Sequence, residues 1–289
     1  MATHKFSAKA AARGAVSIIV FLLLWELGSR SNQWIGADIF SPLREALGAL
    51  GFKKTYLPWV GAIPAPSEVL VVWGGVITEL GYWQSWYNSV FRVLAGFTAA
   101  MLIGIPFGLL LAVNRTAFGI GFPVFEVLRP IPPLAWVPAS IIFWPTQEMS
   151  IAFVTFLGAF YTIVINVVGG AKSIDQRYFQ AAQSMGSSKW DIFRRIILPG
   201  TLPSIMVGSA VGMGITWEVV VAAEMISGGG SQTGGTGGGG LGFFIWNSYV
   251  GGSYQQIVVG MISIGIAGFF SSELLRALGK YVTPWLRLR

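Results

Sequence analysis

The chain has 289 residues, of which 54% are hydrophobic and 11% are charged, and its formal net charge is +7. Soluble domains carry roughly 25% charged residues, so this composition is typical of a polytopic membrane protein. Cysteine is absent and the single histidine is His4, which excludes disulfides, thiolate or histidine metal sites, and cysteine- or histidine-based catalysis.

Six apolar segments are each long enough to cross a bilayer core, which takes about 20 residues of α-helix. They are 14–30, 88–113, 121–145, 148–170, 203–227 and 254–278. Glu26 and Arg30 close the first segment early, and a cleaved signal peptide is its alternative interpretation, although no A-x-A-like cleavage site follows Leu24. The sequence therefore predicts an all-α fold with about six transmembrane helices.

The distribution of Lys and Arg predicts the orientation of these helices. Basic residues precede the first segment, lie between the second and third and between the fourth and fifth, and end the chain. With six spans all of them fall on one side, which predicts that both termini and the loop 171–199 are cytoplasmic. The net positive charge then reflects topology, and no basic patch with base-stacking aromatics indicates a nucleic-acid partner.

The stretch that follows the first segment is too long for a bare loop. Its pieces 42–50 and 66–80 are amphipathic and predict short helices at the outer interface. Trp34, Trp59 and Trp73 would then lie in the aromatic belt. An ordered linker outside the membrane is the alternative.

Arg129 precedes a stretch that is broken by prolines at 130, 132, 133 and 138. Prolines distort a continuous helix, and broken helices at membrane depth are tolerated where they line a cavity. A guanidinium group there suits an anion. We predict that Arg129, Pro132 and Trp136 line a path through the membrane. The alternative is that Arg129 lies near the inner interface and snorkels.

The fifth apolar segment contains two carboxylates, Glu218 and Glu224, which lie six residues apart and so not on one helical face. A charge at mid-bilayer costs about 3 kcal/mol, so such residues face a bundle interior or a water-filled path. We predict that both line the path, with Trp217 as an aromatic wall. A structural hydrogen bond to a neighbouring helix is the open alternative for either glutamate.

Glycines have two expected roles in this chain. Close helix packing is predicted by near small-xxx-small spacing on the second and fifth segments, at Gly96, Gly104, Gly108, Gly208, Gly212 and Gly214. The run 228–240 is glycine-rich but lacks the lysine of a phosphate-binding loop. We expect a flexible outer loop there, followed by a short aromatic segment over 243–249, and no ATP hydrolysis by this chain.

The polar segment between the fourth and fifth spans predicts two short helices. Capping-box spacing occurs twice, in Ser173 with Gln176 and in Ser188 with Asp191. Gly186 is placed to end the first helix, and the pair Leu198-Pro199 is expected to end the second. One small, flat face of the first helix suits docking into another protein's groove; it consists of Tyr178, Ala181, Ala182 and Met185.

This segment resembles a known signature. The spacing Gln180-Ala181-Ala182, three residues, Gly186, nine residues, Ile196, one residue, Leu198-Pro199 resembles the EAA signature of the membrane subunits of type I ABC importers, with Gln180 in place of the leading Glu. The resemblance extends from about Trp83 to the C-terminus. Four further motifs resemble permeases for nitrate, sulfonates (taurine included) and bicarbonate; these are 129–138, 222–225, 240–244 and 283–285.

The resemblance implies a bacterial inner-membrane permease with a permease domain over 83–289, preceded by 1–82 as tail, first helix and outer segment. It implies that cytosolic ATPase subunits, which bind the ATP, dock on the coupling residues Tyr178, Gln180, Ala181, Ala182, Met185 and Gly186. No cofactor is expected in the chain itself. The other implied partners are a periplasmic or lipid-anchored substrate-binding protein, a second copy in a homodimer, and lipid.

Taurine or another sulfonate is the first expected substrate, and nitrate or bicarbonate is the alternative. Two other classes of protein are weighed against an importer permease. A secondary transporter would lack the docking segment, and a membrane-embedded enzyme would need a cluster of His, Cys or paired carboxylates at membrane depth.

Overall fold

The computed structural model describes residues 8–35, 40–52, 57–58, 60–227 and 239–285. Throughout these ranges the regular structure is helical and contains no strand, which confirms the all-α fold class. Trp59 and most of the glycine-rich run, residues 228–238, lie outside the described residues.

The chain forms two compact units. The first contains Met1–Leu80 and Ile245–Met261, and the second contains Gly81–Phe244 and Ile262–Arg289. The sequence predicts a different division, into 1–82 and a permease domain over 83–289. That division stays a prediction.

The first unit begins with one long helix and continues with short ones. These are α1 (Ala8–Ser29), α2 (Ser31–Trp34), α3 (Ser41–Ala49), η2 (Val60–Ala62) and α4 (Pro66–Val76). The helices predicted over 42–50 and 66–80 are thus confirmed. Glu26 joins two of the elements, since its carboxylate accepts hydrogen bonds from the Ser67 amide at 3.1 Å and from Arg30 Nε at 2.6 Å. Glu26, near the end of α1, therefore forms a hydrogen bond with the first turn of α4.

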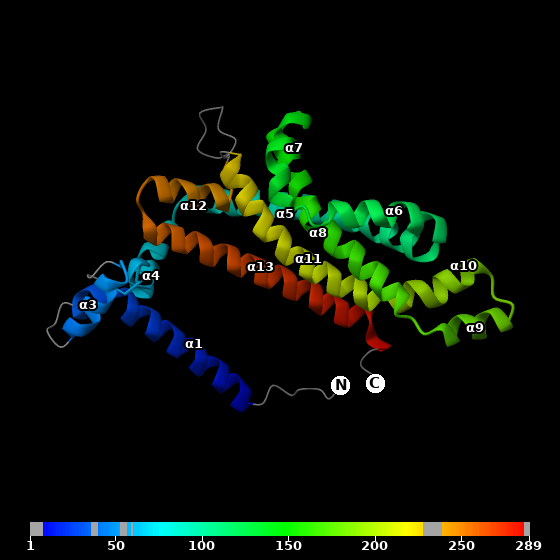
Figure 1. Cartoon of the computed structure of the whole chain (residues 1–289), viewed down its shortest axis with the longest axis horizontal. Helices are drawn as coiled ribbons and strands as arrows, with labels where there is room; N and C mark the ends of the chain where they lie inside the picture. The colour runs from blue at the N-terminus through cyan, green and yellow to red at the C-terminus, as the bar shows by residue number, and fades with distance from the viewer. Residues whose placement is uncertain (1–7, 36–39, 53–56, 59, 228–238, 286–289) are drawn as a thin grey trace. The chain divides into compact units, whose positions relative to one another are not determined.

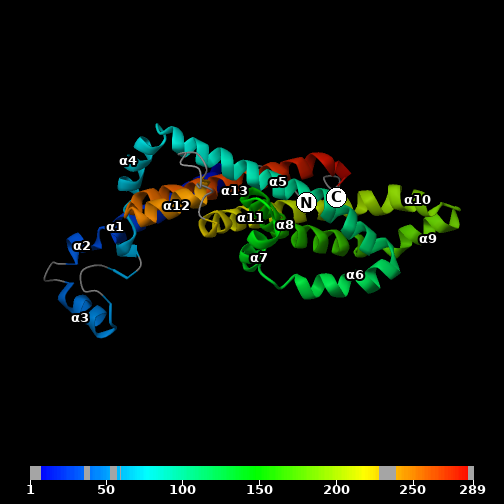
Figure 2. The same cartoon turned by 90° about the horizontal axis from the view of Figure 1, so that it is seen from above.

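The second unit is a helical bundle that ends in a hairpin (Figures 1 and 2). Its elements up to the hairpin are α5 (Leu80–Val113), α6 (Arg115–Leu128), η3 (Pro133–Trp136), α7 (Val137–Phe143) and α8 (Gln147–Lys172). The hairpin and the following helix are α9 (Gln176–Ser184), α10 (Lys189–Ile192), η4 (Phe193–Ile197) and α11 (Leu198–Ile226). The helices α12 (Leu241–Val250) and α13 (Tyr254–Val282) contribute residues to both units.

Five helices among the described residues are long and apolar enough to cross a membrane. They are Ala12–Ser29, Leu80–Val113, Gln147–Lys172, Lys189–Ile226 and Tyr254–Val282, and each matches a predicted span. The sixth predicted segment, 121–145, does not form one long helix, and the break that its prolines predict is confirmed. Helix α6 ends at Leu128, the chain turns at Pro130 and Pro132, and η3 and α7 follow as separate short pieces. The prolines break the helix because they cannot donate the backbone hydrogen bonds that would continue it.

Helix α8 forms the centre of the bundle, and glycines allow its neighbours to approach it. A Cβ atom on Gly96 of α5 would lie 2.8 Å from Thr155 of α8, and one on Gly108 would lie 2.8 Å from Val167. From the other side, a Cβ on Gly208 of α11 would lie 2.6 Å from Asn166. Contacts this short are available only to glycine, so the predicted close packing is confirmed at these positions.

A buried apolar cluster joins α5, α6 and α8 and fixes α6 along the bundle. It contains Leu111, Phe125, Leu157, Tyr161, Val164 and Val168. The rings of Phe125 and Tyr161 lie 5.5 Å apart between centroids. This packing holds the first half of the divided span in place and sets where the break at its end lies.

Candidate functional site

The hairpin starts with a different cap from the one predicted. Asp175 caps α9 by accepting a hydrogen bond from the Arg177 amide at 2.9 Å. The prediction that Ser173 caps this helix is wrong, because Ser173 ends α8 and its hydroxyl donates to the Gly170 carbonyl at 2.8 Å. The second cap is confirmed, since Ser188 Oγ accepts from the Asp191 amide at 3.1 Å.

Gly186 ends α9 in the left-handed conformation, with φ at +74°. The Ser187 amide donates to the Ala182 carbonyl at 3.0 Å, and the Gly186 amide donates to the Gln183 carbonyl at 3.0 Å. This is the hydrogen-bond pattern of a glycine-terminated helix. A residue with a Cβ atom would be strained here, so the turn of the hairpin depends on this glycine.

The second arm of the hairpin does not stop at Pro199, so that prediction is wrong. The chain stays helical from Lys189 to Ile226. A π-helical turn, Phe193–Ile197, precedes the proline, and the Leu198 amide donates to the Phe193 carbonyl five residues earlier. Because this wider turn changes the hydrogen-bond register just before the proline, the helix continues through it.

The face predicted to dock is largely exposed at this end of the bundle. Tyr178 is 55% exposed and Met185 is 78% exposed, and Gln180 and Ala181 are also exposed. Ala182 is the exception, because only 5% of its surface is exposed. The hairpin therefore presents an exposed face with apolar side chains. Ala182 is not part of that exposed surface, because it is buried within this chain.

Two open cavities flank the hairpin. One, of about 680 Å³, lies between α9 and the second arm and is lined by residues that include Lys172, Phe179, Lys189 and Trp190. The other, of about 660 Å³, lies beside Tyr178 and Pro199. The Lys172 ammonium lies 3.5 Å above the ring of Phe118, which fixes the start of α6 beside the end of α8.

The break after α6 holds three of the predicted path residues. Arg129 is exposed, and its Nε lies 3.6 Å from Glu126 Oε1. Pro132 is exposed and leads into η3, and Trp136 is partly buried against the apolar cluster around Phe125. Among the described residues the indole N–H of Trp136 has no hydrogen-bond acceptor.

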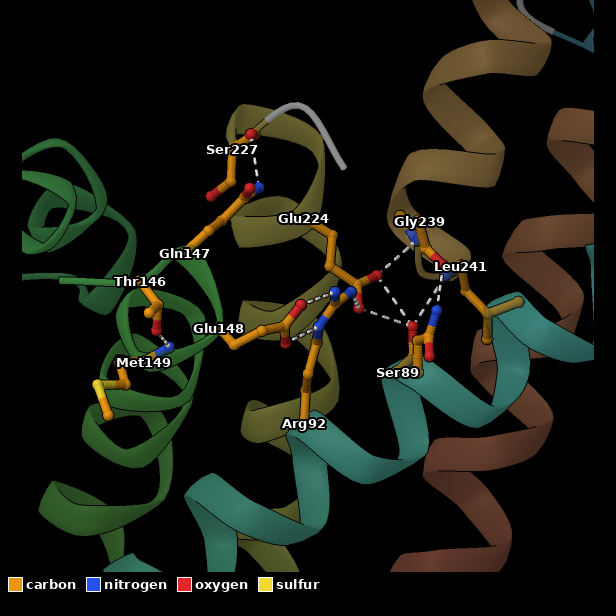
Figure 3. A network of polar contacts seen from close by, with 12 residues as sticks. Ser89, Arg92, Thr146, Gln147, Glu148, Met149, Glu224, Ser227, Gly239 and Leu241 are labelled. Atoms are coloured by element: carbon orange, nitrogen blue, oxygen red, sulfur yellow. Dashed lines mark hydrogen bonds and ion pairs between the residues drawn. The ribbon is translucent and has the colours of Figure 1, made fainter. Parts of the chain in front are cut away.

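Glu224 is buried in a polar network, which Figure 3 shows, near the end of α11 that is opposite the hairpin. Its carboxylate accepts from Arg92 Nη1 at 2.9 Å and from the Ser89 hydroxyl at 2.8 Å. Arg92 Nε also donates to Glu148 Oε2 at 2.8 Å, so one guanidinium serves two carboxylates. The network ties α5, α8 and α11 together with charge-assisted hydrogen bonds.

The same carboxylate holds the start of α12. The Gly242 amide donates to Glu224 Oε2 at 2.9 Å, and the Leu241 amide donates to Ser89 Oγ at 2.8 Å. A Cβ on Gly240 would lie 2.0 Å from the Glu224 carboxylate, and one on Gly242 would lie 2.2 Å from the Val221 carbonyl. The two motifs over 222–225 and 240–244 are thus two sides of one contact, and its glycines are needed for close approach.

Arg92, Ser89 and Glu148 were missed by the sequence reasoning. Arg92 lies inside the predicted span 88–113, where a cation needs a partner as much as Arg129 does. An arginine and two carboxylates in separate apolar segments are a signal that could have found this network.

Trp217 and Glu218 are neighbours on α11 but lie on different faces. Trp217 is buried, and its Nε1 donates to Ser271 Oγ of α13 at 3.0 Å. Glu218 is exposed. The structure therefore brings Trp217 into a helix contact and leaves Glu218 on an open side.

Residues 104–288 match the model of the family described as the inner membrane component of binding-protein-dependent transport systems. The chain belongs to this family. Its relatives are permease subunits of ABC transporters, so this chain is an inner-membrane, multi-pass permease subunit of an ABC importer.

Three relatives illustrate the range of this permease family. The nitrate import permease of Synechocystis sp. is 32% identical over 94% of this chain and 89% of its own length. The taurine transport permease of Escherichia coli K12 is 33% identical over 77% of this chain and 80% of its own. The bicarbonate transport permease of Synechococcus elongatus is 32% identical over 70% of this chain and 69% of its own.

Solved structures share the fold of this permease. A methionine ABC transporter in an inward-facing conformation gives a TM-score of 0.56 at 20% identity, covering 68% of this chain and 94% of the solved one. A bacterial ABC transporter involved in alginate import gives 0.55 at 15% identity, covering 94% and 99%. The type I importer fold predicted from the sequence is therefore confirmed.

Proposed function

We propose that this permease forms half of the translocation path of an ATP-driven importer for a small anion or zwitterion, with α9 as the docking helix for a cytosolic ATPase. The observation that carries the proposal is the exposed face of α9, which includes Tyr178 and Met185. The left-handed turn at Gly186 ends this helix and so fixes the extent of the face. An apolar face of this kind at the end of a membrane bundle needs a protein partner to cover it.

The charge distribution supports an orientation with the hairpin in the cytoplasm. Basic residues gather there, at Lys172, Arg177, Lys189, Arg194 and Arg195. Both termini then lie on the same side, and the end of α11 at Glu224 lies toward the outside. A periplasmic or lipid-anchored binding protein would deliver the substrate there.

Arg129 is proposed to line the path. Helix α6 starts beside Lys172 at the hairpin end and runs for 14 residues, which is about 21 Å of the roughly 30 Å hydrocarbon core. Its end, where Arg129 lies, is then well inside the membrane, next to a broken backbone. This depth favours a path over an arginine that snorkels to the inner interface.

Taurine or another sulfonate is the proposed substrate, and nitrate is the second candidate because a nitrate permease aligns with 94% of this chain. The test is to purify the binding protein encoded beside this permease and to measure its affinity for taurine, nitrate and bicarbonate. Uptake and ATPase stimulation are then measured in proteoliposomes that hold the whole complex. We expect taurine to bind to the binding protein, to be taken up and to stimulate ATPase activity. A binding protein that binds only nitrate would overturn the proposed substrate but not the permease function.

A further inference from the structure

Between Thr201 and Met225, the exposed residues of α11 all lie on one stripe, which we call the open stripe. Val219 packs against α8, where a Cβ on Gly158 would lie 3.2 Å from it, and Trp217 packs against α13, where a Cβ on Gly268 would lie 3.7 Å from it. The open stripe consists of Val207, Val211, Gly214 and Glu218, which are exposed. Their spacing of four, three and four residues places them on one helical face.

Glu218 is the charged member of this stripe. The other glutamates in the spanning helices are partnered, since Glu26 pairs with Arg30, Glu148 and Glu224 bind Arg92, and Glu273 pairs with Arg276. Within the ranges that the structure describes, Glu218 takes part in none of the hydrogen bonds or ion pairs found.

The depth of Glu218 makes a lipid-facing position unfavourable. It lies eight residues before the end of α11 at Ile226, which is about 12 Å along the helix. A carboxylate that faced hydrocarbon at this depth would be costly, and intramembrane carboxylates face a bundle interior or a water-filled path. Trp217 and Val219, on the two flanking faces of α11, are the residues that pack into the bundle interior. The open stripe between them therefore faces water or a second copy across the path.

We propose that Glu218 lies on the translocation path and selects for a substrate with a cationic group, such as a zwitterionic aminosulfonate, over a plain oxyanion. This inference rests on the proposed function. The carboxylate attracts an ammonium group and repels nitrate or bicarbonate, and the Val and Gly residues of the stripe do not offset its charge. In a two-fold dimer two such carboxylates would act on the same path.

The absence of cysteine from the whole chain allows a direct test of this charge preference. Gly214 lies one helical turn from Glu218, and a Cβ there would meet only Ser272 Oγ, at 3.8 Å. The complete reconstituted transporter carrying G214C is labelled with a cationic and with an anionic methanethiosulfonate reagent. The cationic-to-anionic rate ratio should fall about tenfold when E218Q is added. The intrinsic difference between the reagents cancels in this comparison.

The control for labelling is V20C, on the exposed surface of the spanning helix α1, which should react with neither reagent. A G214C protein that stays unlabelled, or a rate ratio that E218Q leaves unchanged, would overturn the proposal. The result does not depend on knowing the substrate. Binding-protein-stimulated ATPase activity, measured on the same preparation, separates a failure of this inference from a failure of the proposed function.

Transport provides the second readout, with taurine and isethionate, which carries a hydroxyl in place of the ammonium group. E218Q should lower the taurine-to-isethionate uptake ratio about tenfold, whereas E218D should retain most of it. E273Q on α13 is the matched carboxylate control and should leave the ratio unchanged. The proposal is contradicted if the wild-type complex transports nitrate in preference to taurine and E218Q leaves the uptake ratio unchanged.

Discussion

Arg92 is shared by two carboxylates that differ in burial, because Glu224 is fully buried whereas the Glu148 side chain is 60% exposed. Replacing Glu224 by Gln would leave part of a buried cation unpaired, and breaking a buried pair costs about 3–5 kcal/mol. We expect E224Q to lower the thermal unfolding midpoint of the purified permease clearly.

E148Q is the control for this prediction, since exposed partners of an ion pair contribute about 0–1 kcal/mol. Its effect on the midpoint should be small. Equal effects of the two substitutions would contradict the view that burial decides the strength of this network.

Arg129 has an exposed guanidinium that can pair bidentately with sulfonate or nitrate oxygens. A path residue must bind weakly enough to release, so we expect R129Q to retain assembly and basal ATPase activity and to lower substrate uptake several-fold. R129K should recover part of the uptake, because the charge returns without the planar fork. Normal uptake by R129Q, or a failure to assemble, would assign Arg129 a purely structural role.

At the scale of single residues, the sequence predicted Glu224 as a path residue or, alternatively, as a hydrogen-bond partner of a neighbouring helix, but not which residues bind it. A charged residue in an apolar segment can be recognised in a sequence. Arg92 is such a residue, but the sequence analysis did not include it among the candidate site residues. The pairing of Arg92 with Glu148 and Glu224 depends on three helices that are distant in the chain, so local spacing could not reveal it.

Helix α9 is the element that we propose as the docking site for the ATPase. We expect G186A to strain the left-handed turn by about 1 kcal/mol or more and to displace the exposed face, with loss of ATPase co-purification and transport. A181R should have the same effect by placing a bulky charge on that face. Ala181 is the better site for this test than Ala182, which is buried within the chain.

The matched control for the hairpin is G51A. Gly51 also has a positive φ, of +79°, and open space around its Cβ position, but it lies in the first unit. It should cost similar backbone strain and leave ATPase co-purification intact. If G186A and A181R both transport normally, α9 is not the docking helix.

At the scale of elements, hydrophobic length predicted the long helices well, while caps and breaks were less predictable. The chain uses Asp175 and not Ser173 to start α9, although both residue types can cap. Prolines at 130–133 end a helix, yet Pro199 does not, because a π-helical turn precedes it. Whether a proline breaks a helix is decided by backbone hydrogen bonds that the sequence does not specify.

At the scale of the whole molecule, the described residues contain one proposed docking helix, α9, whereas an ATPase with two sites presents two docking surfaces. A homodimer with a two-fold axis normal to the membrane is the simple solution. We expect the mass of the purified complex to correspond to two copies of this chain with two ATPase subunits. A mass that fits one copy beside a different permease would refute the homodimer.

The number of spans shows how far composition alone can predict the whole fold. Five of the six predicted spans exist as long helices in the described parts of the chain, and the sixth is divided into α6, η3 and α7. Apolar length identifies a segment that can occupy the membrane, but it does not distinguish one helix from two short ones. That distinction follows from the prolines and from the packing of α6 on α8.

The length of α11 has a mechanical consequence. Its 29 residues span about 44 Å, from the π-helical turn beside the hairpin to the buried Glu224. A tilt of about 5° about the hairpin end would move the far tip by about 4 Å, more than the length of a hydrogen bond. If an ATPase docks on α9 as proposed, such a tilt would act as a lever arm on the ion pair between Arg92 and Glu224 at the opposite end of this helix.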